Sequence, residues 1–145
     1  MIHANQAGWA GIEPRAYKER PDLFRDVVRY TLLGGRDADE PLSFEVRYFE
    51  IAPGGYSSLE HHAHAHAVLV VKGQGMVRLG TRGETICPWD VVYVAPHEVH
   101  RFYAGDSEPL GFICVVDRDR DRPLVVDEDA PRYEGGPSHG GGPAG

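Results

Sequence analysis

Short runs of hydrophobic residues, separated by glycine and proline turns, follow one another along most of this 145-residue chain. In several runs hydrophobic and polar residues alternate, which is typical of a β-strand with one buried face, and no long stretch has the period of a helix. Strands are predicted at residues 26–33, 44–51, 67–72, 76–79, 90–94, 100–103 and 110–116. Many short strands joined by tight turns indicate an all-β fold, either a sandwich or a closed barrel.

The chain divides into three parts. Residues 1–25 are predicted as an N-terminal arm, in which only residues 9–24 have room for a short helix, and residues 26–128 form the barrel domain. Residues 129–145 are rich in glycine and proline, have few side chains to offset the entropy of ordering, and are predicted as a flexible tail. Residues 117–122 alternate Asp and Arg, which indicates a solvated loop or edge, or alternatively a salt-bridged contact between two copies.

Composition narrows the class of protein. The net charge of −7 argues against a nucleic-acid partner, because binding phosphates requires a basic face. No run approaches the ~18 apolar residues of a membrane span, and the first residues lack the pattern of a signal peptide, so we predict a cytoplasmic protein with no membrane partner. Cys87 and Cys114, far apart in a chain without a secretory signal, are interpreted as reduced packing residues.

A dense histidine cluster is the strongest chemical signal. Four of the eight histidines lie between His61 and His66, directly after Glu60, and imidazole with carboxylate suits a divalent transition metal. On an extended chain Glu60, His62, His64 and His66 share a face while His61 points away, but positions 60 and 66 would then be about 20 Å apart. A turn around residues 63–65 is therefore expected to fold the ligands back onto one ion.

The spacing of this cluster resembles the first motif of the cupin family, G-x5-H-x-H-x3,4-E-x6-G. Gly54, Glu60, His62, His66 and Gly73 stand at the motif positions. The residue types at the first and third ligand positions are exchanged, because Glu60 replaces the usual His and His66 replaces the usual Glu. The ligand inventory is kept while its geometry changes, and we expect the specific chemistry to depend on this exchange.

A second stretch, Trp89 to Ala104, is similar to the second cupin motif, with His100 at the ligand position. The resemblance implies a double-stranded β-helix, or jelly-roll barrel, with one divalent transition metal inside, chosen from Mn, Fe, Ni, Cu or Zn with Mn or Fe favoured. Carried over position by position, the metal ligands are Glu60, His62, His66 and His100. Two alternatives stay open: Glu60 lies behind the ligands as a base, or His64 in the turn replaces Glu60 as the fourth ligand.

Alternation along the strands also selects the side chains of the barrel interior. The apolar candidates are Phe49, Ile51, Val68, Val70, Val92, Val94, Phe102 and Phe112. The polar groups predicted to reach the cavity are Tyr48, Tyr93, Arg101 and Tyr103. Tyr93 and Arg101 are the candidate catalytic residues, since a tyrosine can act as acid or base and an arginine can hold a carboxylate substrate.

The resemblance implies a metal-dependent oxidoreductase, dioxygenase-like, that acts on a small organic molecule bound in the barrel. A metal-dependent lyase or isomerase is the close variant. A metal-binding or metabolite-binding protein without turnover is the alternative class, because the same barrel hosts both. A homodimer is also predicted, with the N-terminal arm and residues 27–33 adding to the sheet edge of a neighbour.

Overall fold

The computed structural model describes residues 8–18 and 23–126, and within these residues it contains strands and turns but no α-helix. The strands are β1 (Arg15–Ala16), β2 (Arg25–Leu33), β3 (Phe44–Tyr56), β4 (Glu60–His61), β5 (His66–Lys72), β6 (Gly75–Leu79), β7 (Arg82–Ile86), β8 (Val91–Val94), β9 (His100–Ala104), β10 (Leu110–Asp117) and β11 (Leu124–Val125). The all-β prediction is confirmed. In the described part of the chain, no helix is long and apolar enough to cross a membrane.

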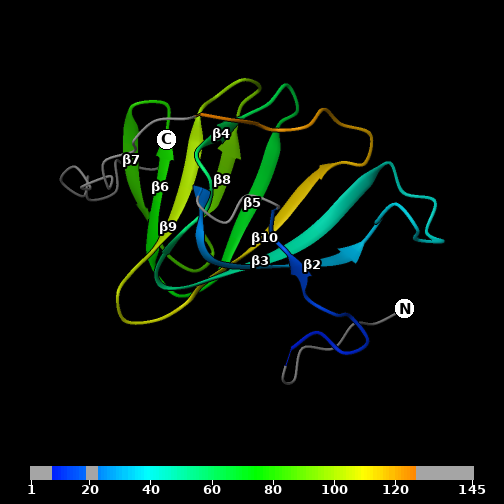
Figure 1. Cartoon of the computed structure of the whole chain (residues 1–145), viewed down its shortest axis with the longest axis horizontal. Helices are drawn as coiled ribbons and strands as arrows, with labels where there is room; N and C mark the ends of the chain where they lie inside the picture. The colour runs from blue at the N-terminus through cyan, green and yellow to red at the C-terminus, as the bar shows by residue number, and fades with distance from the viewer. Residues whose placement is uncertain (1–7, 19–22, 127–145) are drawn as a thin grey trace.

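All strands belong to one antiparallel sheet that curls around a common interior (Figure 1). The hydrogen-bonded order is β11-β4-β9-β3-β10-β5-β8, while β2 pairs with β3 and β6 pairs with both β9 and β7. The long strand β3 pairs with β10 along residues 44–51 and then, at Tyr56, with β9. This curled sheet is the predicted jelly-roll barrel.

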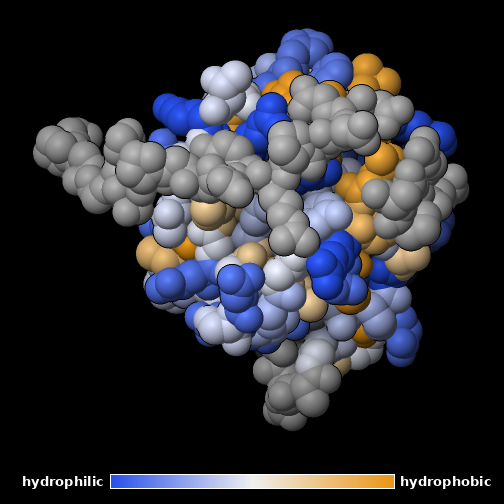
Figure 2. Space-filling model, turned by 60° about the vertical axis from the view of Figure 1, so that its left-hand side comes forward, coloured by the Kyte–Doolittle hydropathy of each residue, from blue (hydrophilic) through white to orange (hydrophobic). Residues whose placement is uncertain are grey.

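The barrel interior is the hydrophobic core. Because successive residues of a strand point to opposite faces, alternate positions of the strands fill the interior. All eight predicted interior residues are buried in one cluster: Phe49, Ile51, Val68, Val70, Val92, Val94, Phe102 and Phe112. Phe112 stacks on Phe49 and on Phe102, with ring centroids 5.4 and 4.6 Å apart. The outer surface in Figure 2 is mostly hydrophilic, with hydrophobic residues gathered in smaller patches.

The first described segment lies against the barrel and brings basic and aromatic side chains to it. Strand β1 pairs with Val28 and Arg29 of β2. The ring of Tyr17, which follows β1, packs edge-on against Phe24 and Phe49. Strand β2 pairs with β3 of the same chain. The expected contact of residues 27–33 with a second copy stays a prediction. The predicted tail lies outside the described residues.

Asp117 of the Asp/Arg alternation ends β10, and residues 118–122 form a loop whose side chains contact the chain itself. The Arg118 guanidinium donates hydrogen bonds to the carbonyl oxygens of Gly35 and Arg36 at 3.0 and 3.2 Å. Arg120 donates to Glu45 at 2.8 Å. The loop is thus largely exposed, as expected of a solvated loop, but two of its arginines also tie it to the connection between β2 and β3 and to β3 itself.

Candidate metal centre and its cavity

Three histidines from two separate parts of the sequence meet inside the barrel. His62 follows β4, a turn occupies residues 63–64, and His66 begins β5, as the sequence predicted. Glu60 of β4 stands opposite His100 of β9 in the strand register, which brings His100 to the same place. One ring nitrogen each of His62, His66 and His100 lies within 4.8 Å of the others, so this trio can hold a metal ion.

The hydrogen bonds of the trio leave nitrogen lone pairs for a metal. The His62 Nδ1–H donates to the carbonyl oxygen of His64 at 2.6 Å, and the His100 Nδ1–H donates to that of Glu98 at 2.9 Å. A ring nitrogen that bonds a backbone carbonyl carries the proton, which leaves Nε2 as the acceptor. The Nε2 atom of His62 is buried and has no hydrogen-bond partner. An unpartnered buried acceptor among imidazoles fits a bound cation.

Burial also sets the protonation of the trio. It lowers the pKa of His62 from 6.5 to about 4, and it lowers the pKa of His66 and of His100 as well. All three rings are therefore neutral near pH 7, and the neutral imidazole is the form that binds a metal.

Glu60 is buried beside the trio but turned toward other partners. Its Oε2 atom accepts hydrogen bonds from Lys18 Nζ and from Ser58 Oγ, the latter at 2.7 Å. Its Oε1 atom is 3.8 Å from His100 Nε2. Burial alone would raise the pKa of Glu60, but the Lys18 ammonium and the two hydrogen bonds hold it below its ordinary value. The carboxylate is thus charged, and its role as a fourth ligand stays a prediction.

His64, the alternative fourth ligand, is fixed at the edge of the trio. Its Nδ1 atom is 2.7 Å from Asp121 Oδ1, and Asp121 also accepts the backbone N–H groups of Ala63 and His64. These hydrogen bonds lower the pKa of Asp121. The His64 ring stacks on His62 at 3.7 Å between centroids, and its Nε2 lies 3.1 Å from Nε2 of His66. Asp121 of the charged loop therefore orients a histidine beside the candidate metal.

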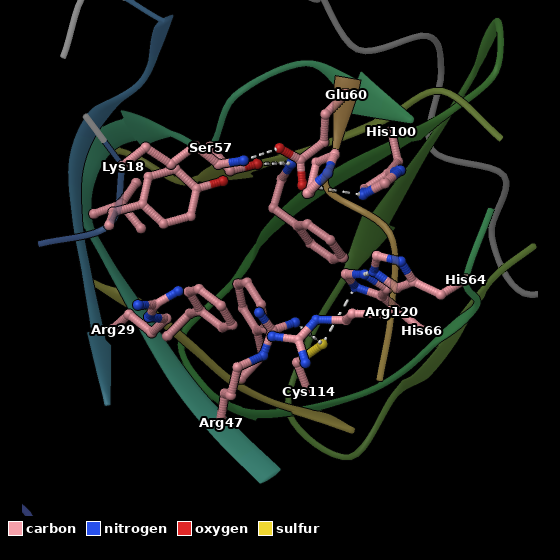
Figure 3. A pocket seen from close by; sticks show the side chains of 16 residues that line it. Lys18, Arg29, Arg47, Ser57, Glu60, His64, His66, His100, Cys114 and Arg120 are labelled. Carbon is pink, nitrogen blue, oxygen red and sulfur yellow. Dashed lines mark hydrogen bonds and ion pairs between the residues drawn. The ribbon is translucent and has the colours of Figure 1, made fainter. Parts of the chain in front are cut away.

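His66 and His100 of the trio line a cavity of about 200 Å³. The lining is mixed: aromatic and aliphatic side chains, the histidines, and four basic groups (Figure 3). The lining residues are Tyr17, Lys18, Val27, Arg29, Arg47, Phe49, Ser57, Glu60, His64, His66, His100, Phe102, Phe112, Cys114, Arg120 and Pro123. Such a cavity, with few polar groups placed around an apolar body, suits one small molecule.

Cys114 is reduced and packs in the hydrophobic core, as predicted, and its thiol also lines this cavity. Its Sγ atom is 3.2 Å from Nδ1 of His66 and 3.4 Å from the Arg47 Nη2 that donates to it. The side chain is 1% exposed, and burial raises the pKa of the thiol. Cys87 is exposed, and neither cysteine is in a disulfide.

The two predicted catalytic residues do not line the cavity. Tyr93 is 63% exposed on the outer face of β8, because Val92 and Val94 on either side take the inner positions. Arg101 is buried outside the barrel wall, where its guanidinium stacks on the ring of Tyr56 at 5.0 Å. Tyr48 and Tyr103 are likewise absent from the lining. His61 is half-buried and His97 exposed, and neither lines the cavity.

The basic lining groups were missed because no residue motif marks them. Lys18 comes from the segment after β1, Arg29 from β2, Arg47 from β3 and Arg120 from the charged loop. For Arg47 a signal existed, since it has the same alternation phase as Phe49 and Ile51 on one strand. A charged residue at an inward position indicates a functional lining group.

Comparisons with known proteins agree with this geometry. A family model described as Cupin domain matches residues 47–116. A protein of Rhodospirillum rubrum named 1-methylthio-D-xylulose 5-phosphate methylsulfurylase is 40% identical over 125 residues, which cover 86% of this chain and 78% of that protein. The crystal structure of a cupin-2 domain from the same organism is 40% identical, with a TM-score of 0.76 over 86% of this chain and 81% of that one. A cupin 2 conserved barrel domain protein from Rhodopseudomonas palustris is 39% identical, with a TM-score of 0.77 over 86% of each chain.

Proposed function

Because this chain belongs to the cupin family, we propose that it is a metal-dependent enzyme that removes the methylthio group from a small phosphorylated ketose. The observation that carries the proposal is the position of a thiol, Cys114, in the same cavity as His66 and His100 of the histidine trio. The Rhodospirillum rubrum relative supplies the substrate class, since its name describes a methylsulfurylase of 1-methylthio-D-xylulose 5-phosphate.

In this proposal His62, His66 and His100 hold one divalent transition metal, with Mn or Fe favoured. When bound, the ion supplies a Lewis acid for a carbonyl oxygen of the substrate. Glu60 and His64 are the two candidates for a fourth ligand. The neutral state of the three rings near pH 7 supports metal binding without prior loss of a proton from them.

Cys114 is the group that receives sulfur. If Nε2 of His66 binds a metal, its Nδ1 carries the proton and donates to the Cys114 sulfur, as Arg47 does from the other side. Two donors favour the thiolate, which opposes the effect of burial on the thiol pKa. The thiolate attacks the methylthio sulfur, a disulfide bond forms, and the carbon–sulfur bond breaks. Its electron pair goes to the carbon next to the carbonyl, which then takes a proton from solvent.

The cycle needs a second thiol as reductant. A small external thiol attacks the mixed disulfide on Cys114, takes the methylthio group, and restores the free cysteine. The cavity volume of about 200 Å³ is compatible with a small thiol entering after the sugar phosphate leaves.

The two cysteines provide a matched test. Metal-loaded protein is mixed with 1-methylthio-D-xylulose 5-phosphate without added thiol, and its intact mass is measured. We expect a methylthio adduct on wild type and on Cys87→Ser, and none on Cys114→Ser. With external thiol present, the first two proteins turn over and Cys114→Ser does not. Full turnover by Cys114→Ser would exclude the thiol step, and unchanged turnover by His62→Gln together with His100→Gln would exclude the metal.

Oxygen chemistry on a small organic molecule is the second candidate. It is favoured by the diversion of Glu60 to Lys18 and Ser58, which leaves coordination positions of a trio-bound ion open to dioxygen. Oxygen consumption by the Fe-loaded or Mn-loaded protein with a small substrate, unaffected by Cys114→Ser, would favour this candidate over methylthio removal.

A further inference from the structure

Guanidinium groups crowd one side of the cavity. Arg29, Arg47 and Arg120 all line it, and Figure 3 shows Arg29 and Arg47 across the cavity from Glu60 and His100. Arg29 and Arg120 also line a second hollow of about 500 Å³, so the two spaces share a basic wall. Like charges held together away from bulk water repel one another unless an anion lies between them.

The nearby carboxylate, Glu45, pairs with only one of the three guanidinium groups, that of Arg120. Both oxygens of Glu45 are committed, one to Arg120 at 2.8 Å and the other to the Thr31 hydroxyl at 3.3 Å. Across residues 8–18 and 23–126, no carboxylate lies within ion-pair distance of Arg29 or Arg47. Two positive charges therefore remain uncompensated by these residues.

Both unpaired arginines also have donors without acceptors. The Nε atoms of Arg29 and Arg47 are buried and have no hydrogen-bond partner. Arg47 is only 7% exposed, and its guanidinium lies over the ring of Phe49 at 5.0 Å and donates to the Cys114 sulfur. Burial, followed by the charge of Arg47, lowers the pKa of Arg29. Buried donors without acceptors are costly and point to a ligand that accepts from them.

We propose that Arg29, Arg47 and Arg120 form a subsite for a phosphate monoester group, so that a bound substrate reaches from these arginines to the histidine trio. A phosphate dianion matches the two uncompensated charges, whereas a carboxylate would leave one. Its oxygens also match the planar forks of guanidinium groups. The extension to a ketose phosphate rests on the proposed function, but binding of phosphate itself does not.

The test uses inorganic phosphate as the probe, with calorimetric titration of metal-free and metal-loaded protein. We expect phosphate to bind in both forms, and Arg29→Gln to weaken binding by about tenfold to a hundredfold, the effect of losing a charge-assisted hydrogen bond. Arg82→Gln is the matched control, since Arg82 is exposed on β7 and pairs with Glu84 there. It should bind phosphate as wild type does. Acetate should bind more weakly than phosphate.

A second variant separates a loss of phosphate binding from a loss of folding. Arg47→Lys keeps the charge and the stem but removes the fork, so it should fold and still bind phosphate several-fold more weakly. Without phosphate, Arg29→Gln should melt at the wild-type temperature or above, because a repelling charge has been removed. With phosphate, wild type should gain more in melting temperature than the variant does.

The subsite is wrong if Arg29→Gln and Arg47→Lys both bind phosphate as wild type does. It is also wrong if phosphate binds only when metal is present, or if acetate binds as tightly as phosphate. Arginine-dependent phosphate binding without turnover of the methylthio ketose phosphate would support the subsite and reject the proposed function, so the two failures are distinguishable.

Discussion

Acid should destabilise the metal-free protein through its buried histidines, and His62 allows the effect to be calculated. The His62 side chain is 2% exposed, and its pKa falls from 6.5 to about 4 on folding. Between pH 4 and pH 6.5 the His62 ring is protonated in the unfolded chain and neutral in the folded protein. Stability is therefore complete above pH 6.5 and decreases as the pH falls toward 4, and the difference corresponds to at most about 3 kcal/mol from this one ring.

The assay is urea unfolding of metal-free protein at pH values from 7 down to 4, with the free energy of unfolding plotted against pH. His62→Gln removes the titrating ring and keeps a polar side chain of similar size, so its curve should be flatter than that of wild type. His97→Gln removes an exposed histidine and should run parallel to wild type. Equal slopes for wild type and His62→Gln would refute the reasoning. Metal-free protein is needed because a bound ion competes with the proton for the same nitrogen.

Three further outcomes are expected. Asp121→Asn, which loses the charged acceptor of the His64 ring, should weaken metal affinity by about 10- to 100-fold in a metal titration, and unchanged affinity would show that His64 orientation is irrelevant to the ion. Chelation should lower the melting temperature, since an ion at 100 times its Kd stabilises by about 2.7 kcal/mol, and identical melting with and without chelator would count against a resident metal. Gly73→Ala should cost roughly 1–3 kcal/mol in urea unfolding, because Gly73 has φ +74° and a Cβ there would lie 1.9 Å from the Pro109 carbonyl oxygen. Gly80→Ala, with φ +62° but open space around it, should cost less, and an equal cost would contradict the steric explanation.

The barrel could be predicted because its strands alternate clearly. Apart from Arg47 and His66, the inner positions named for β3, β5, β8 and β10 are apolar and their outer neighbours are mixed, so phase and face follow from the sequence. Strand β7 could not be predicted in this way. Its residues Arg82–Ile86 have only one buried member, and the strand exists because its backbone pairs with β6 across a tight turn. Pairing partners of this kind are a property of the folded sheet and not of the local pattern.

For the site, the histidine trio was within reach of sequence reasoning and the rest of the cavity was partly so. The same alternation that places Phe49 and Phe112 inside also places Arg47 and Cys114 inside. Neither is among the predicted cavity groups, because no motif marks Arg47 and Cys114 is predicted only as a packing residue. Tyr93 was predicted inside although its phase on β8 is the outer one. Strand phase is thus a stronger criterion for lining residues than side-chain chemistry.

Other contacts of the site depend on tertiary structure that no local pattern encodes. Lys18 reaches Glu60 because β1 pairs with β2, and Asp121 reaches His64 because the loop after β10 folds back over the turn before β5. Each contact joins residues more than 40 positions apart. A charged residue in a loop is expected to lie at the surface. Only the folded structure shows which of these residues contact the site.

The acidic balance of the chain and the basic lining of its cavity act at different ranges. A net charge of −7 spread over the surface is screened by salt within about 8–10 Å, so it acts on the approach of a partner. Arg47 is buried, Arg29 is half-buried with a buried Nε atom, and both are screened less than surface charges, so they govern what is held once inside. Total charge therefore bears on the class of macromolecular partner and gives no information about a small ligand. The sign of the charge at inward strand positions does give information about a small ligand. Here that charge is positive, and it lies beside the Cys114 thiol and the three imidazoles that can hold a metal.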